Sequence, residues 1–144
     1  MAHKYYILGA GESGAGAAVL AAKQGYDVFV SDGGVIKDIY KKELASFGIA
    51  FEEGGHNVDK ILQADQIMKS PGIPETAPIV KAIRAKGIPV ESEIELAWRF
   101  KGKSKIIGIT GSNGKTTTTA LTYHICKHAG VNCALVGNIG ESIA

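Results

Sequence analysis

Short apolar runs alternate with longer amphipathic segments along the chain. The apolar runs are rich in β-branched and aromatic residues and predict strands at residues 5–8, 27–31, 50–52, 66–69, 89–90, 106–110 and 133–136. The amphipathic segments predict helices at residues 13–24, 36–47, 77–86, 93–100 and 115–128, several followed by a glycine suited to a left-handed C-terminal cap. This alternation, with short connections, predicts an α/β fold with a parallel sheet and right-handed crossovers.

The segment RFKGKSK, residues 99–105, is polar, lacks apolar periodicity and is predicted to be a linker. We place the domain boundary there, with a Rossmann-like parallel-sheet domain at 1–102. Residues 103–144 then hold one strand, a phosphate loop, one helix and one strand. A single unit of this kind cannot bury both faces of a parallel sheet, so we expect a truncated beginning of a second α/β domain. Alternatively, these residues extend the first sheet.

Composition excludes several classes of protein. Of 144 residues, 45% are hydrophobic and 21% charged, as in globular proteins, and the net charge of +2 gives no reason to expect a nucleic-acid or membrane partner. No apolar run is long enough to cross a bilayer and the chain starts directly with a strand, so we expect a cytoplasmic protein. Cys126 and Cys133 are expected to be reduced and buried. The 19 glycines are about twice average usage and suggest tight turns beside ligands.

The first glycine-rich stretch, GAGESG at residues 9–14, follows a predicted strand, opens a predicted helix and fits the pattern G-x-G-x-x-G. Asp32 ends the next strand, at about the distance expected of an acid that binds a ribose. The stretch therefore predicts a diphosphate at the start of the helix. It does not distinguish a dinucleotide from another nucleotide, so an NAD-binding oxidoreductase domain or a regulatory nucleotide-binding module stays open. Tight packing of helix on strand without any ligand is a third possibility.

The second glycine-rich stretch, GITGSNGKTTTTA at residues 108–120, resembles a phosphate loop with shifted spacing, since Ile109 stands where the standard pattern has glycine. The residues expected to bind ATP are Gly111, Ser112, Asn113, Gly114, Lys115, Thr116 and Thr117. Backbone N–H groups and Lys115 would contact the phosphates, and the Thr116 hydroxyl would face Mg²⁺. Two nucleotide sites in one chain suggest an enzyme that couples ATP cleavage to a nucleotide-carried substrate.

Two further groups of polar residues have simpler explanations. His124 and His128 have a spacing that can bind metal, but no third ligand is apparent, so a partly exposed helix face is favoured. Glu93 and Glu95 lie at the start of a predicted helix, where acids interact favourably with the helix dipole, and a capping role is favoured over catalysis.

Several motifs occur in the order and spacing of one enzyme family. They are GAGESGAGAA, VSD at residues 30–32, SPGIP at 70–74, SEIELA at 92–97, GITGSNGKTTTT and GNIGE at 137–141. Together they resemble the Mur ligase family over the whole chain, as its N-terminal domain and the start of its central ATPase domain. Within the family, S-N-G-K-T, SPGIP and GNIG resemble the members that add D-glutamate. The shifted spacing of the phosphate loop is also that family's pattern.

The resemblance implies an ATP-dependent amide ligase of peptidoglycan synthesis that uses Mg²⁺ and joins D-glutamate to UDP-N-acetylmuramoyl-L-alanine through an acyl phosphate. It implies Lys115 and Thr116 as catalytic residues, with Thr116 toward Mg²⁺. The implied UDP-substrate residues are Gly11, Glu12, Ser13, Gly14, Asp32, Ser70, Pro71, Gly72 and Asn138. The other magnesium ligands and the D-glutamate site lie outside this chain, so we expect it to be inactive alone. Gly33 and Gly34 depart from the family, which often has a hydroxyl and a basic residue there to grip the uridine.

Overall fold

The computed structural model describes residues 2–137. Its contacts define two compact units, one ending at Phe100 and the other beginning at Lys101. All side chains that are found buried belong to the first unit. Residues 2–137 include no helix that is both long and apolar enough to span a membrane.

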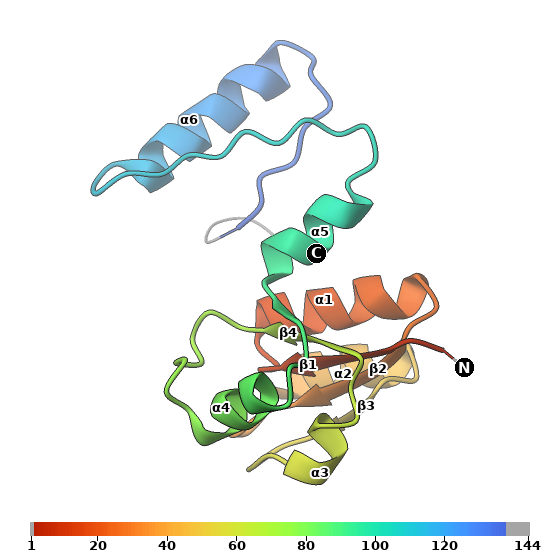
Figure 1. Ribbon diagram of the computed structural model, residues 1–144. Helices are drawn as coiled ribbons and strands as arrows, with labels where there is room; N and C mark the ends of the chain where they lie inside the picture. The colour runs from red at the N-terminus through yellow and green to blue at the C-terminus, as the bar shows by residue number, and fades with distance from the viewer. Residues whose placement is uncertain (1, 138–144) are drawn as a thin grey trace. The chain divides into compact units, whose positions relative to one another are not determined.

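The first unit is a parallel α/β sheet domain (Figure 1). Its elements are β1 (Lys4–Leu8), α1 (Glu12–Lys23), β2 (Asp27–Ser31), α2 (Asp38–Ser46), β3 (Ala50–Glu52), α3 (Val58–Ile61), β4 (Gln66–Lys69), α4 (Pro78–Ala85), β5 (Val90–Glu91) and α5 (Glu93–Phe100). The strand order is β3-β2-β1-β4-β5, with every neighbouring pair parallel. The order reverses between β1 and β4, and ligands of open α/β sheets bind at the carboxyl ends of strands at such a point.

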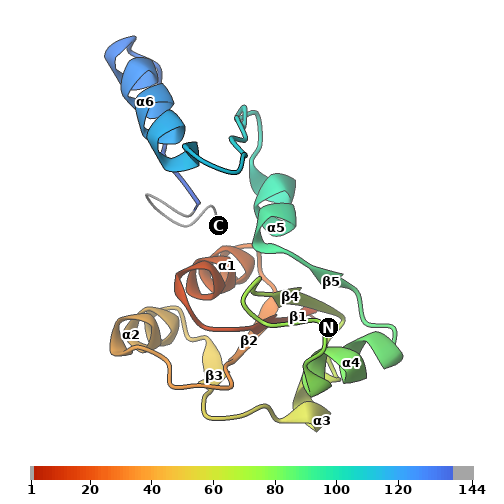
Figure 2. The same cartoon turned by 90° about the vertical axis from the view of Figure 1, so that its left-hand side faces the viewer.

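Helices cover both faces of the sheet (Figure 2). One core cluster joins Tyr5 and Ile7 of β1 to side chains of α1, α2 and α5, and the other joins Tyr6 and Leu8 to side chains of α3 and α4. Successive strand residues point to opposite faces, so a strand covered on both sides must be apolar throughout. This is why β1 reads as an unbroken apolar run and was predicted within one residue.

Turn chemistry ends the helices as expected. Gly25, Gly48 and Gly87 follow α1, α2 and α4 with positive φ angles of 82°, 67° and 74°, which confirms the predicted left-handed caps. The sequence analysis missed α3, which is too short to show a helical period. Its signal is Asn57, whose side chain accepts a hydrogen bond from the Lys60 N–H at 3.1 Å, as an N-cap does.

The second unit contains α6 (Lys115–His128), which has the predicted limits. The strands predicted at 106–110 and 133–136 are wrong for the described part of this unit, where Val136 is the one residue in a bridge. Ile107, in the first of these two segments, is 70% exposed. A strand needs a hydrogen-bonded neighbour, and the sheet formed by β1–β5 does not extend into this segment.

A buried tyrosine makes the stability of the first unit depend on pH. The Tyr5 hydroxyl donates a 2.5 Å hydrogen bond to Glu91, which also pairs with Arg99. Burial, and then the contact with Glu91, raises the pKa of Tyr5 far above its usual range. Because the folded pKa is the higher one, the stabilisation is complete below the ordinary tyrosine pKa of about 10 and is lost as the pH rises further.

We therefore expect Tyr5 to ionise only as the unit unfolds in alkali. Burial also raises the pKa of Tyr6. An absorbance titration at 295 nm, run alongside circular dichroism, should therefore show a tyrosine signal that follows unfolding in the wild type and is smaller by one tyrosine in Tyr5→Phe. Ionisation of every tyrosine before any loss of helix signal would contradict this expectation.

Candidate functional site

The turn between β1 and α1 uses its glycines for different purposes. Gly9 has a φ of 93°, and a Cβ built there would lie 2.6 Å from the Ser70 Oγ. A Cβ on Gly14 would lie 1.9 Å from the Gly9 carbonyl oxygen, so the first turn of α1 packs directly on the loop. Gly11, the N-cap of α1, has nothing within 4 Å of such a Cβ. The loop is therefore closed toward the protein at Gly14 and open at Gly11.

The start of α1 is suited to an anion. Its N-cap has no side-chain hydrogen bond, which leaves the first backbone N–H groups without a side-chain cap. These N–H groups belong to Glu12, Ser13 and Gly14, the residues predicted to hold a diphosphate. The positive end of the helix dipole adds to the attraction for a phosphate.

The Asp32 carboxylate holds the glycine loop in place by a hydrogen bond to its backbone. Its Oδ2 accepts a 2.6 Å hydrogen bond from the Ala10 N–H, and its Oδ1 accepts one of 2.8 Å from the Gly34 N–H. A carboxylate has about four acceptor positions, so contacts to a ribose remain compatible with both bonds. The structure thus brings the predicted acid to the glycine loop and gives it a positioning role that the motif alone did not reveal.

The turn Ser70–Pro71–Gly72 follows β4 and meets the glycine loop at the point where the strand order reverses. The Ser70 N–H bonds to the Leu8 carbonyl at 3.0 Å, and the Ile73 N–H closes the turn on the Ser70 carbonyl at 3.1 Å. Residues from three separate motifs, around positions 9–14, 32 and 70–72, therefore line one stretch of the sheet's carboxyl edge.

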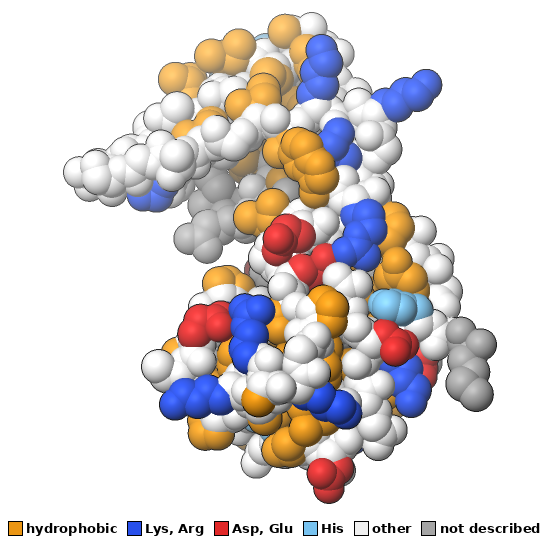
Figure 3. Space-filling model, in the orientation of Figure 1, with side chains coloured by type: hydrophobic (Ala, Val, Ile, Leu, Met, Phe, Trp, Pro, Cys, Tyr) orange, Lys and Arg blue, Asp and Glu red, His pale blue; other side chains and the backbone are white. Residues whose placement is uncertain are grey.

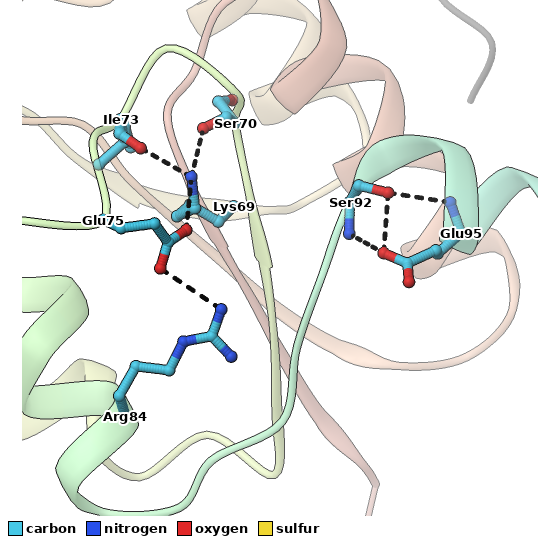
Figure 4. Close-up of polar contacts among 7 residues, drawn as sticks. All are labelled: Lys69, Ser70, Ile73, Glu75, Arg84, Ser92 and Glu95. Atoms are coloured by element: carbon cyan, nitrogen blue, oxygen red, sulfur yellow. Dashed lines mark hydrogen bonds and ion pairs between the residues drawn. The ribbon is translucent and has the colours of Figure 1, made fainter.

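A cleft of about 380 Å³ lies beside this turn, between the loop after β4, α4 and the start of α5. Figure 4 shows the Lys69 amine donating to the Ile73 carbonyl at 2.7 Å and pairing with Glu75 at 3.3 Å, while Glu75 also pairs with Arg84. The hydrogen bond from Lys69 lowers the pKa of Glu75. The sequence analysis missed this cleft because its walls are joined only by tertiary packing.

One wall of the cleft is the capped start of α5 (Figure 4). Glu95 Oε2 accepts from the Ser92 N–H at 2.6 Å and from its hydroxyl at 2.8 Å. The reciprocal contact, from the Glu95 N–H to the Ser92 Oγ, is 3.3 Å long and completes a capping box. The backbone hydrogen bond from Ser92 lowers the pKa of Glu95, as expected for a capping carboxylate. Capping by Glu95 is confirmed.

The second predicted loop also precedes a helix. Gly114, the N-cap of α6, has a φ of 75° and makes no side-chain cap hydrogen bond. The Lys115 amine folds back to the carbonyls of Gly111 and Ser112. The Thr119 hydroxyl donates to the Lys115 carbonyl at 2.7 Å and is occupied within the helix, whereas Thr116 and Thr117 are exposed.

Helix α6 exposes apolar side chains. None of its residues is buried, and Leu121 and Ile125 are each 57% exposed. Figure 3 shows hydrophobic side chains on the surface of this part of the chain. Isolated exposed leucines are ordinary, but a helix whose residues are at most partly buried has little of the packing that normally stabilises helices in proteins.

The remaining predictions concern metals, thiols and one asparagine. The rings of His124 and His128 are 4.0 Å apart, but no group of three potential ligands occurs among residues 2–137. Cys126 and Cys133 are free thiols as predicted, yet half-buried instead of buried. No side chain among residues 101–137 is fully buried. Asn138 lies outside the described residues.

Comparison with known proteins identifies the family. Residues 4–78, more than half of the chain, match the model of the MurD N-terminal domain. This chain belongs to the Mur ligase family. Residues 109–144, which include the second loop, match the Mur ligase middle domain.

Named relatives cover the whole of this Mur ligase chain. It is 59% identical over 138 residues to a UDP-N-acetylmuramoylalanine--D-glutamate ligase of Bacteroides fragilis and 57% identical over 145 residues to the enzyme of that name in Cytophaga hutchinsonii. These alignments include 96% and 100% of the chain but only 31% and 32% of the relatives. The chain therefore spans about a third of the length of the curated relatives that it matches.

Solved structures agree on the fold. A pseudomurein peptide ligase type C from Methanothermus fervidus superposes with a TM-score of 0.61 at 30% identity, over 92% of this chain and 29% of that one. A UDP-N-acetylmuramate:L-alanyl-gamma-D-glutamyl-meso-diaminopimelate ligase from Neisseria meningitides gives 0.66 at 24% identity, over 90% and 41%. The α/β fold predicted from the sequence is confirmed.

Proposed function

We propose that this chain is the substrate-binding domain, and the start of the ATPase domain, of the ligase that adds D-glutamate to UDP-N-acetylmuramoyl-L-alanine in peptidoglycan synthesis. The observation that carries the proposal is the meeting of the glycine loop, Asp32 and the Ser70–Gly72 turn at one sheet edge, in a chain whose named relatives are such ligases. A cytoplasmic location fits this role, because ATP is available there.

The UDP part of the substrate would lie along the first unit. Its diphosphate would bind the open N–H groups of Glu12, Ser13 and Gly14, with Gly11 leaving room for the oxygens. Asp32 would meet the uridine, and the Ser70–Gly72 turn would flank the substrate on the β4 side. Asn138 would contact the muramoyl portion.

ATP would bind the second loop through residues Gly111–Thr117. The exposed loop, the glycine N-cap and the missing side-chain cap at the start of α6 fit a phosphate group. Lys115 would leave the loop carbonyls and donate to the phosphates, and the Thr116 hydroxyl would be one ligand of Mg²⁺. When bound, Mg²⁺ supplies positive charge that offsets the phosphate oxygens.

The reaction explains why a phosphate loop is needed. A carboxylate is a poor electrophile, because it has no good leaving group in neutral water. In the proposed reaction the alanine carboxylate attacks the γ-phosphorus of ATP, releasing ADP and forming an acyl phosphate, and the D-glutamate amine then displaces phosphate to give the amide. Lys115 would stabilise the charge on the transferred group. D-Glutamate would bind outside this chain.

Ligand preference tests the first site. We expect titration calorimetry of the chain to show binding of UDP and of UDP-N-acetylmuramic acid, with no binding of NADH at the same concentration. Gly11→Ala should weaken the binding of both uridine ligands by roughly tenfold, because the alanine methyl group would occupy the open side of the loop. A preference for NADH would instead support the dinucleotide-binding alternative and refute the ligase assignment.

A further inference from the structure

Three side chains form a hydrogen-bonded chain where β2 and β3 end. The Ser31 Oγ lies 2.6 Å from Glu52 Oε1 and 2.7 Å from His56 Nδ1. Ser31 is a polar residue with only 1% of its surface exposed, whereas Glu52 and His56 are half-buried. A buried hydroxyl with two such partners positions those partners firmly.

Counting protons fixes the direction of these hydrogen bonds. A carboxylate only accepts, and Glu52 Oε1 already accepts from the Asn57 N–H at 2.8 Å. The single proton of the Ser31 hydroxyl must therefore be donated to Glu52. The hydroxyl can then contact the imidazole only by accepting a proton from His56 Nδ1. The neutral ring consequently carries its proton on Nδ1, and Nε2 has a free lone pair.

This Nε2 is accessible. Within residues 2–137 it has no hydrogen-bond partner, and no buried side-chain nitrogen or oxygen there is left unpaired. It therefore has some exposed surface. A Cβ built on Gly33 would lie 3.2 Å from Nε2, so any larger residue at this position would crowd the imidazole. The glycine that departs from the family pattern is what leaves room for His56.

The loop that carries His56 is attached to the substrate edge. The Gly54 N–H bonds to the Gly34 carbonyl at 2.8 Å, and the Gly55 N–H bonds to the Asp32 carbonyl at 3.3 Å. Asp32 in turn holds the Ala10 N–H of the glycine loop. His56 thus lies further along the same carboxyl edge. A nucleotide whose diphosphate binds at the start of α1 extends its nucleoside across the end of β2, toward this position.

We propose that His56 Nε2 accepts a hydrogen bond from the nucleoside of the bound uridine nucleotide, with Ser31 and Glu52 as positioning residues. Uridine offers two kinds of donor, the imide N–H of the base and the ribose hydroxyls. His56 then supplies, from the loop between β3 and α3, a contact that no side chain at positions 33 and 34 can make. This inference rests on the uridine-binding function proposed above.

Nucleotide analogues test the contact in the purified chain. Titration of the wild type and His56→Phe with UDP, N3-methyl-UDP and 2′,3′-dideoxy-UDP should show UDP binding about five- to tenfold weaker in the variant. The analogue that lacks the contacted donor should lose a similar factor in affinity in the wild type and little more in His56→Phe. Loss with N3-methyl-UDP assigns the base, and loss with 2′,3′-dideoxy-UDP assigns the ribose.

Controls separate binding from folding. His3→Phe makes the same chemical change at the opposite end of the sheet and should leave UDP affinity unchanged, and thermal unfolding should confirm that all variants fold. Imidazole ¹⁵N spectra of the unliganded wild type, assigned with His56→Phe, should place the His56 proton on Nδ1. This last measurement does not depend on how a variant folds.

Three results would overturn the inference. The first is that His56→Phe binds UDP as tightly as the wild type does. The second is that the ratio of UDP affinity to analogue affinity is the same in the wild type and in His56→Phe. The third is that the neutral His56 ring carries its proton on Nε2. Each of these leaves uridine binding by the chain intact. If instead the wild type fails to bind UDP at all, the proposed function fails as well.

Discussion

Replacing Gly14 by alanine is expected to destabilise the first unit by about 2 to 3 kcal/mol. Alanine is the better helix former by about 1 kcal/mol, so propensity alone predicts the opposite sign. Packing outweighs it, because the new Cβ would lie 1.9 Å from the Gly9 carbonyl oxygen, and this partner is backbone that cannot rotate away. Either α1 or the glycine loop must shift. Urea denaturation followed by circular dichroism measures the difference.

Gly11→Ala is the matched control for this substitution. It also replaces a glycine by alanine in the same loop. A Cβ on residue 11 would have no atom within 4 Å, and the φ angle of −72° at Gly11 suits alanine. Only the weaker N-cap preference of alanine opposes it, at a cost of about 1 kcal/mol or less. We expect Gly11→Ala to affect mainly uridine-ligand affinity and Gly14→Ala mainly stability. Equal stability of the two variants would show that the close packing of Gly14 does not constrain the fold.

Replacing Lys115 by alanine is expected to weaken MgATP binding by one to two orders of magnitude. The proposed contacts of its amine with phosphate are charge-assisted and worth roughly 1.5 to 3 kcal/mol. In the structure the amine is exposed and contacts only carbonyls of its own loop, so its removal should change stability little. Titration calorimetry with MgATP, paired with a thermal melt, separates the two effects.

Lys127→Ala controls for the loss of one positive charge. Lys127 is an exposed lysine in the last turn of the same helix, far along α6 from its N-terminus, and its amine lies over the Tyr123 ring. Its replacement should leave MgATP affinity unchanged within about twofold. If both variants lose affinity equally, the effect is one of net charge and the phosphate role of Lys115 is refuted.

Features determined by local chemistry were predicted well. The limits of β2, β3, β4, α5 and α6 follow from apolar period, capping residues and glycine stops, all of which act within a few residues. The predicted strands at 106–110 and 133–136 failed for the opposite reason. Strand geometry is stabilised by a partner strand, and apolar pattern alone cannot supply one.

The candidate site likewise has parts that the sequence predicted and parts that only the fold revealed. Motif spacing singled out the glycine loop, Asp32 and the phosphate loop, because each places particular residue types beside the start of a helix. Motif spacing did not reveal that Asp32 clamps the Ala10 N–H, because that bond depends on β1 and β2 being adjacent. The cleft beside Lys69 and the hydrogen-bonded chain Glu52–Ser31–His56 were not predicted from the sequence, since each joins segments that only the folded sheet brings together.

By itself the sequence determined the α/β alternation, the helix ends and the residues able to bind phosphate, because these depend on side-chain type and spacing along the backbone. Only the tertiary structure decided which carboxyl ends share an edge, that Gly9 lies against Ser70, and that His56 occupies the space left by Gly33. Strand order brings together residues distant in the chain, and hydrogen bonding and close packing act over a few ångströms in space, whatever the separation in sequence.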